Sequence, residues 1–136
     1  MGTVVQLKNK INNSYSELKS SVEDKLILVE ERIKSKLSSK VELVDEMTSY
    51  HLRTGGKRLR ALLTLGSAKL CDYQKGSRDV NLAACVELIH AATLMHDDVI
   101  DNSDVRRGKK TLNKIWGNQS SISVSYTHLT LPTRSY

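Results

Sequence analysis

The stretch HAATLMHDDVIDNSDVRRG, residues 90–108, decides how the rest of the chain is interpreted. It holds four aspartates and ends in two adjacent arginines and a glycine. Upstream, residues 81–95 are largely apolar and contain no Gly or Pro, which predicts a mostly buried helix. If this helix continues to residue 101, Asp97 and Asp101 lie one turn apart, offset by about 40° on one face. Carboxylates so placed repel each other unless a hard cation such as Mg²⁺ bridges them, with water and phosphate oxygens as its other ligands.

An acidic cluster of this kind also has a more ordinary interpretation. Asp and Asn collect at helix ends and in turns, where their side chains bond to nearby backbone groups. His90 favours a site, because seven residues bring an α-helix back to within about 20° and place His90 on the stripe of Asp97 and Asp101. A lone histidine on an apolar helix is more often a core residue, so it is only this alignment that favours a functional role.

Length and composition predict one small helical domain. The chain has 136 residues, enough for one core but not two, with 39% hydrophobic residues, 26% charged residues and a single Pro. Its net charge of +6 suits a polyanion, either a nucleic acid or a small diphosphate. Only 4% of the residues are aromatic, with no Phe and one Trp, so base-stacking platforms and a nucleic-acid partner are not expected.

Cysteine usage and the apolar segments predict a soluble, cytoplasmic protein. Cys71 and Cys85 form no CxxC pair and have no paired His motif beside them, so reduced thiols are expected and a structural zinc site is not. The N-terminus has no apolar core of a secretory signal. The apolar run over 82–95 is interrupted by Glu87 and His90 and is too short to span a bilayer.

The first part of the chain predicts two helices. Apolar residues at steps of three and four predict a long amphipathic helix over 4–33, which residues 12–14 could divide in two. A second helix over 40–52 is expected to begin at a capping box formed by Ser39 and Glu42. The residues expected in the core of this second helix are Val41, Val44 and Met47.

A third helix is expected over 57–70, with Lys57, Arg58 and Arg60 in its first turn. Cations are disfavoured at a helix N-terminus, so this arrangement makes sense if an anion binds to the backbone N–H groups and the basic side chains together. A solvated basic turn is an equally ordinary interpretation. The fourth helix should run from 80 to about 101, with Asp79 as its N-cap.

After the acidic stretch the pattern weakens. Arg106 and Arg107 are suited to bind phosphate oxygens in forked geometry. Residues 111–116 predict a short helical or irregular segment, and a fifth helix is expected to start at 117–118. Residues 124–136, VSYTHLTLPTRSY, have no acid, no helical period and the chain's only Pro, so we expect a domain over 1–122 and an unstructured or weakly extended tail over 123–136.

Two blocks of sequence resemble one family. GGKRLR at 55–60 and ELIHAATLMHDDVIDNSDVRRGKKT at 87–111 resemble the trans-polyprenyl diphosphate synthases, in the long-chain branch related to octaprenyl diphosphate synthase. The match covers about residues 40–122. The resemblance implies an all-α fold, the N-terminal and incomplete part of the antiparallel isoprenoid synthase bundle, which surrounds a deep apolar cavity and is usually homodimeric. It implies a prenyltransferase that joins isopentenyl diphosphate to an allylic diphosphate, farnesyl diphosphate or similar, using Mg²⁺.

The same resemblance implies roles for particular residues. The contacts to isopentenyl diphosphate would be Lys57, Arg60, His90 and Arg107. Arg106 would contact the allylic diphosphate, while Asp97 and Asp101 would bind Mg²⁺ with Asp98 in support. The growing tail would pass Thr93 and Ala92, four and five positions before Asp97, and their small side chains imply a long product of the kind used for quinone side chains. Alternatively, these two residues simply pack helix on helix.

Departures from the family pattern lead to further expectations. Family members are more than twice as long and carry a second aspartate-rich motif, which this sequence does not contain. Residues 123–136 look like out-of-frame or appended sequence, so we expect a truncated chain with half a substrate site and little activity alone. Two alternatives remain. A class I terpene cyclase fragment shares the DDxxD pattern but not the blocks for a second diphosphate, and a basic helical binding module without catalysis predicts salt-sensitive, Mg²⁺-independent binding of polyanions.

Overall fold

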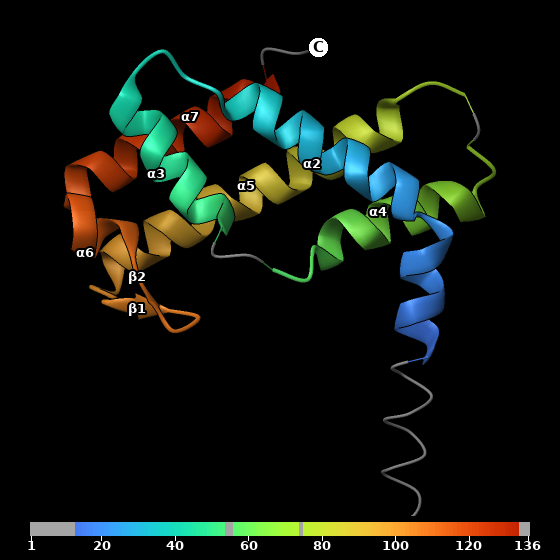
Figure 1. The fold of residues 1–136 in the computed structure, drawn as a ribbon, viewed down its shortest axis with the longest axis horizontal. Helices are drawn as coiled ribbons and strands as arrows, with labels where there is room; N and C mark the ends of the chain where they lie inside the picture. Colours follow the sequence, from blue (N-terminus) through green and yellow to red (C-terminus); the bar gives the residue numbers. More distant parts are fainter. Residues whose placement is uncertain (1–12, 54–55, 74, 134–136) are drawn as a thin grey trace, which may run out of the picture.

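The computed structural model describes residues 13–53, 56–73 and 75–133, the last three by their backbone alone. It confirms the all-α class: one long central helix, α5, packs against α2, α4, α6 and α7 (Figure 1). The helices are α2 (Glu23–Leu37), α3 (Glu42–Arg53), α4 (Leu59–Leu70), α5 (Arg78–Ile100), α6 (Leu112–Trp116) and α7 (Asn118–Thr133). A small antiparallel hairpin, which the sequence did not predict, joins β1 (Val105–Arg106) to β2 (Lys109–Lys110).

The N-terminal helix is broken later than expected. Residues 13–21 are helical, dark blue in Figure 1, and a turn at Val22 separates them from α2; Tyr15 and Leu18 of this segment pack against the core. Val22 is buried, so the break turns an apolar side chain inward. The first part of the predicted helix over 4–33 lies outside the described residues, and the predicted break at 12–14 is wrong for residues 13 and 14, which are helical.

Two hydrophobic clusters form the core. The larger one joins α2, α4 and α5 and contains Val22, Val29, Ile33, Leu37, Ala61, Leu62, Leu65, Val80, Ala83, Ala84 and Leu88. The smaller one joins the ends of α3, α5, α6 and α7 and contains Met47, Met95, Leu112 and Val124. α5 contributes to both clusters, so it fixes the relative positions of the elements on either side of it.

The start of α3 differs in detail from the predicted capping box. Ser39 Oγ accepts the backbone N–H of Val41 at 3.1 Å, but it is Asp45, not Glu42, that accepts the backbone N–H of Ser39, at 3.4 Å. Met47 is fully buried as predicted. The prediction of a buried Val41 is wrong: it lies before the first helical turn and is 58% exposed.

The predicted N-cap of α5 is also wrong. α5 begins at Arg78 with Ser77 as its N-cap, and Asp79 lies inside the first turn. The Asp79 carboxylate is buried and forms an ion pair with Lys25 of α2, so a tertiary contact takes it away from the capping position. α5 ends at Ile100, with Asp101 as its C-cap, close to the predicted boundary.

The prediction of an unstructured tail is wrong over residues 123–133, because α7 continues to Thr133. Val124 and His128, four residues apart on one face, are buried and α7 packs along α5. The hydroxyls of Ser125 and Thr127 bond to carbonyl groups three residues earlier in the helix. Packing of one face therefore stabilises a helix whose composition favours it poorly. Among the helices of the described ranges, none is both long enough and apolar enough to cross a bilayer.

Candidate functional site

A pocket of about 470 Å³ lies where the C-terminal end of α3, the loop before α4, the middle of α5 and the hairpin meet. It is lined by five basic side chains, two imidazoles and one carboxylate, together with a few apolar groups. The basic residues are Lys57, Arg58, Arg60, Arg106 and Arg107, the imidazoles are those of His51 and His90, and the acid is Glu87. All five residues predicted to contact the two diphosphates are therefore gathered in one pocket.

Two carboxylates hold the basic loop before α4. Arg58, the N-cap of α4, adopts a left-handed conformation with φ 47° and ψ 38°. Its guanidinium bonds to Glu30 of α2, with Nε 2.7 Å from Oε1, and Nη1 lies 3.6 Å from Glu87 Oε2 of α5. The other carboxylate oxygen of Glu87 accepts the backbone N–H of Ala61 at 3.1 Å.

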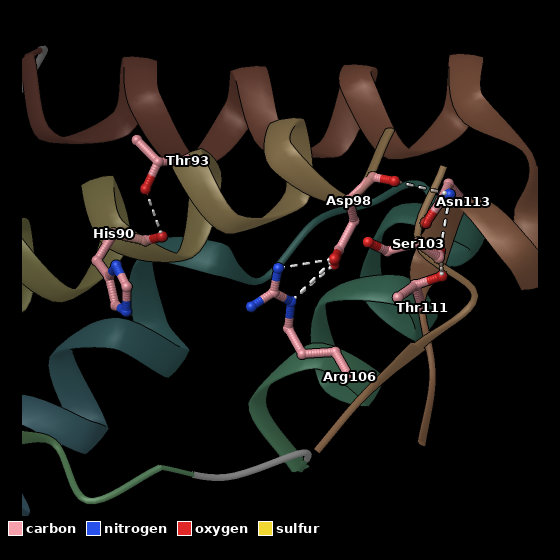
Figure 2. A network of polar contacts seen from close by, with 7 residues as sticks. All are labelled: His90, Thr93, Asp98, Ser103, Arg106, Thr111 and Asn113. Carbon is pink, nitrogen blue, oxygen red and sulfur yellow. Dashed lines mark hydrogen bonds and ion pairs between the residues drawn. The ribbon is translucent and has the colours of Figure 1, made fainter. Parts of the chain in front are cut away.

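A third carboxylate, Asp98, fixes Arg106 at the other side of the pocket (Figure 2). Arg106 Nε lies 2.9 Å from Asp98 Oδ1 and 3.1 Å from Oδ2, and Nη2 lies 2.8 Å from Oδ1. The hydrogen bond to Asp98 holds the pKa of Arg106 above its ordinary value. Asp98 is buried, and the guanidinium supplies the charged partner that a buried carboxylate requires.

The remaining cations of the pocket have no such partner. The side chains of Lys57, Arg60 and Arg107 form no hydrogen bond or ion pair with any described residue. Three unpaired cations that face one cavity repel each other, and an anion with several oxygens would relieve that repulsion. The pocket therefore has the electrostatic character of a site for a polyphosphate or diphosphate group.

His90 lines the same pocket from α5 (Figure 2). Burial, followed by the nearby charge of Arg60, lowers the pKa of His90 from its usual 6.5; Glu87 raises it, and Arg107 and Arg106 lower it further. The lowered pKa favours the neutral imidazole, in which one ring nitrogen donates and the other accepts a hydrogen bond.

The hairpin that carries the two arginines is tightly anchored. Its central residues Arg107 and Gly108 both have positive φ, 52° and 76°, the requirement of a type I′ turn. Tyr50 Oη donates to the carbonyl oxygen of Lys110 at 2.9 Å, and Lys109 Nζ donates to that of Arg53 at 3.3 Å. The hairpin is thus tied to the C-terminal end of α3, across the pocket from α5.

Hydrogen bonds at the C-terminal end of α5 terminate the helix and fix the start of the hairpin. Asn102 takes a left-handed φ of 49°, and the N–H of Ser103 reaches back to the carbonyl of Asp98 at 2.9 Å, as in a Schellman motif. The carbonyl of Ser103 accepts the Thr111 hydroxyl at 2.6 Å, and the Asn113 amide donates to the carbonyl of Asp98 at 3.2 Å (Figure 2). These bonds fix where the chain leaves α5, and so where Arg106 and Arg107 begin.

The predicted metal-binding aspartates lie away from the pocket lining. Asp97 and Asp101 are exposed at the end of α5, one turn apart, with the N–H of Asp101 bonded to the carbonyl of Asp97 at 2.8 Å. No group of three His, Cys, Asp or Glu side chains within the described ranges is arranged to hold a metal ion. Two accessible carboxylates nevertheless fit a hard ion such as Mg²⁺, which takes its other ligands from water and phosphate oxygens.

The two predicted chain-length residues differ in environment. Ala92 is fully buried, whereas Thr93 is exposed and donates its hydroxyl hydrogen bond to the carbonyl of His90 at 2.8 Å (Figure 2). Thr93 lies on an exposed stripe of α5 that also carries Leu82, Ile89 and Asp97. This stripe is mostly apolar until it reaches the aspartates.

Two polar residues of the pocket, His51 and Glu87, were not predicted from the sequence. His51 lines it from α3 and makes an edge-to-face contact with His128, with ring centroids 6.3 Å apart. Both have a sequence signal, because each falls at helical spacing from buried residues: His51 follows Met47 by four positions, and Glu87 follows Ala83 by four. A polar residue at a buried position of an amphipathic helix needs a partner, which makes it a candidate for a site.

Comparison with known proteins gives the family. The polyprenyl synthetase family profile matches residues 41–134. Octaprenyl diphosphate synthase from Escherichia coli (strain K12) is 44% identical over 92 residues, which cover 68% of this chain and 28% of that protein. Octaprenyl diphosphate synthase from Haemophilus influenzae is 37% identical over 111 residues, which cover 82% of this chain and 33% of that protein.

Solved structures agree with the sequence relatives. A decaprenyl diphosphate synthase from Rhodobacter capsulatus superposes with a TM-score of 0.82 at 38% identity, over 88% of this chain and 37% of that one. A polyprenyl synthase from Caulobacter crescentus CB15, complexed with calcium and isoprenyl diphosphate, superposes with a TM-score of 0.84 at 34% identity, over 88% of this chain and 36% of that one. The chain thus spans about a third of the length of the relatives it matches. By the family match, the identities and the shared fold, this chain belongs to the polyprenyl synthetase family.

Proposed function

We propose that this chain is the diphosphate-binding, N-terminal part of a trans-polyprenyl diphosphate synthase. The whole protein would add isopentenyl diphosphate units to an allylic diphosphate such as farnesyl diphosphate, giving a long all-trans polyprenyl diphosphate, and would act as a homodimer. The observation that carries the proposal is the convergence in one pocket of the His90 imidazole with three cations, Lys57, Arg60 and Arg107, whose side chains have no partner among the described residues.

The residues of the pocket fall into two groups. Lys57, Arg60, His90 and Arg107 would bind the diphosphate of isopentenyl diphosphate and so orient its double bond. Arg106, held in place by Asp98, would face the allylic diphosphate from the hairpin. Holding two substrates at adjacent positions makes their reaction effectively unimolecular and so lowers its entropic cost.

Asp97 and Asp101 would hold Mg²⁺ at the exposed end of α5, beside the allylic diphosphate. When bound, Mg²⁺ neutralises the charge of this diphosphate and makes it a better leaving group. The Caulobacter crescentus relative, complexed with calcium and isoprenyl diphosphate, supports the binding of a divalent cation and a diphosphate. The exposed stripe through Thr93, Ile89 and Leu82 offers an apolar path for the product tail, leading away from Asp97.

Calorimetric titration of the chain with farnesyl diphosphate, with and without Mg²⁺, tests the proposal. We expect binding that requires Mg²⁺ and that Asp97→Ala abolishes. Asp104→Ala is the matched control, since it removes the same charge from an exposed side chain seven residues further on, outside the DDxxD motif. Binding that needs no Mg²⁺, that weakens steeply with salt and that responds equally to both substitutions would instead identify a general polyanion-binding module.

A further inference from the structure

Glu87 is the one acidic side chain among the described residues that line the pocket. A carboxylate is out of place in a site for an anion, because its charge repels the ligand and weakens the field of the five cations. It is also buried, with 6% of its surface exposed, on a stretch of α5 whose other buried residues are apolar. Such a residue must make contacts that compensate for both effects.

The first of these contacts completes the start of α4. The first N–H groups of a helix have no partner within it, and the N-cap residue, Arg58, provides no side-chain bond. The Oε1 atom of Glu87 accepts the N–H of Ala61, the third residue of α4, at 3.1 Å. A residue of another helix therefore supplies the cap that the local sequence lacks.

The second contact fixes a strained residue. Arg58 has a positive φ of 47°, which costs energy for a residue with a side chain. Its guanidinium lies between two acids, with Nε 2.7 Å from Glu30 Oε1 and Nη1 3.6 Å from Glu87 Oε2. The two carboxylates therefore hold Arg58 from α2 on one side and from α5 on the other.

The two contacts of Glu87 restrict the backbone around Lys57 and Arg60. Arg60 lies between Arg58 and Ala61, so the backbone that carries it is fixed at both ends, and Lys57 directly precedes the fixed Arg58. We propose that Glu87 is a positioning residue of the pocket: it holds Ala61 and, together with Glu30, Arg58, and thereby directs Lys57 and Arg60 towards the ligand. The inference rests on the proposed function in one respect, that the ligand is a diphosphate.

Whether removal of the Glu87 charge strengthens or weakens pyrophosphate binding distinguishes a positioning role from a purely electrostatic one. If Glu87 acted only through its charge, Glu87→Gln would strengthen the binding of inorganic pyrophosphate, because it removes a repulsive group. We expect the opposite. Pyrophosphate should bind about tenfold more weakly to Glu87→Ala, the loss expected when a charge-assisted contact no longer forms, and the loss should be smaller in Glu87→Gln, whose carbonyl oxygen still accepts the Ala61 N–H.

Glu30→Gln provides a second variant at the more exposed end of the arrangement, where folding is less at risk, and Glu31→Gln on the next, exposed position of α2 is its matched control. Glu30→Gln should weaken pyrophosphate binding, and Glu31→Gln should not. Amide hydrogen exchange at Ala61, measured without ligand, should accelerate in Glu87→Ala and stay unchanged in Glu31→Gln.

The outcomes separate the two claims. Unchanged or tighter pyrophosphate binding in both Glu87→Gln and Glu30→Gln would overturn the positioning role, as would unchanged exchange at Ala61 in a folded Glu87→Ala chain. A wild-type chain that binds no pyrophosphate, with or without Mg²⁺, would refute the proposed function instead. In that case the exchange rate of Ala61 still decides whether Glu87 holds the loop.

Discussion

The arginines of the pocket divide according to their partners. Arg58 and Arg106 are held by carboxylates of the same chain, while Arg107, at the tip of the hairpin, has no hydrogen-bond or ion-pair partner in the part of the chain that the structure describes. Arg107 lies so close to Gly56 that a Cβ added to Gly56 would stand 2.8 Å from Nη1. The glycine therefore leaves room for the guanidinium at the edge of the pocket, a role that follows from a close approach between two segments far apart in sequence.

Gly56→Ala should displace the Arg107 guanidinium while leaving the fold intact, because the far end of a flexible side chain can move at little cost. Losing one charge-assisted contact weakens pyrophosphate binding by about 1.5 kcal/mol, roughly tenfold in Kd, which calorimetry would measure. A double-mutant cycle with Arg107→Ala is the control. Gly56→Ala should have no further effect in that background, and an undiminished effect there would contradict the explanation.

His51 should make the stability of the chain depend on pH. Burial, with the nearby His128, Arg58, Arg107 and Arg106, lowers the pKa of His51 from 6.5 to about 4. The unfolded chain therefore binds a proton more readily than the folded one, so stability is fully present above pH 6.5 and is lost as pH falls towards 4, by up to about 3 kcal/mol. Urea denaturation at pH 7.5 and pH 4.5 should show a smaller difference for His51→Gln than for the wild type. An equal loss in both would show that other groups, such as His90 and His128, carry the whole effect.

At the scale of elements, the hairpin is the part of the site that depends most on contacts with other elements for its stability. Strands of two residues are too short to be stable alone, so its geometry depends on the turn and on the anchors from Tyr50 and Lys109. Gly108 has φ 76°, and an added Cβ would meet nothing within 4 Å. A side chain introduced at position 108 would therefore affect stability through the backbone conformation and not through a steric clash.

Gly108→Ala should destabilise the hairpin by about 1–2 kcal/mol, the cost of a left-handed conformation for a residue with a side chain. Amide exchange across residues 105–110 should accelerate and pyrophosphate binding should weaken, while the helical circular dichroism stays constant.

Asn102→Gly is the complementary variant. The backbone of Asn102 is also left-handed, with φ 49°, so glycine should relieve backbone strain at that position. Unchanged exchange in the hairpin of Gly108→Ala would show that its anchors alone determine its shape.

Elements with a strong period could be predicted from the sequence, and those fixed by tertiary contacts could not. The bounds of α5 could be predicted within a few residues, because a long, mostly apolar segment without Gly or Pro strongly favours a buried helix. The hairpin could not be predicted because two-residue strands have no period. The predicted start of a helix at 117–118 is confirmed, but the continuation of α7 to Thr133 could not be predicted, because its packing on α5 outweighs its composition. In the site, the predicted basic residues are brought together, but the contacts of Glu87 and Glu30 with Arg58 link positions 29 and 28 apart and leave no local signal.

At the scale of the whole molecule, α4 is apolar on two sides. One side buries Leu62 and Leu65 against α2 and α5, while the other leaves Leu63 and Leu70 exposed, by 61% and 89%. A helix of this kind normally belongs between two layers of a larger bundle, and the relatives of this chain are more than twice as long. The described part of the chain thus presents apolar surface that its own helices do not cover.

The chain should therefore self-associate. Burying each exposed leucine in a contact between copies would contribute up to about 2 kcal/mol, and the net charge of +6 opposes this attraction, so association should increase with salt as the repulsion is screened. Sedimentation velocity at low and high salt would measure it. The double variant Leu63→Glu, Leu70→Glu should remain monomeric at concentrations where the wild type associates, and Ser35→Glu, which adds a negative charge to an exposed position of α2, should associate like the wild type. If the double variant associated as strongly as the wild type, the contact between copies would lie away from these two leucines of α4, for example on the exposed stripe of α5 that carries Leu82 and Ile89.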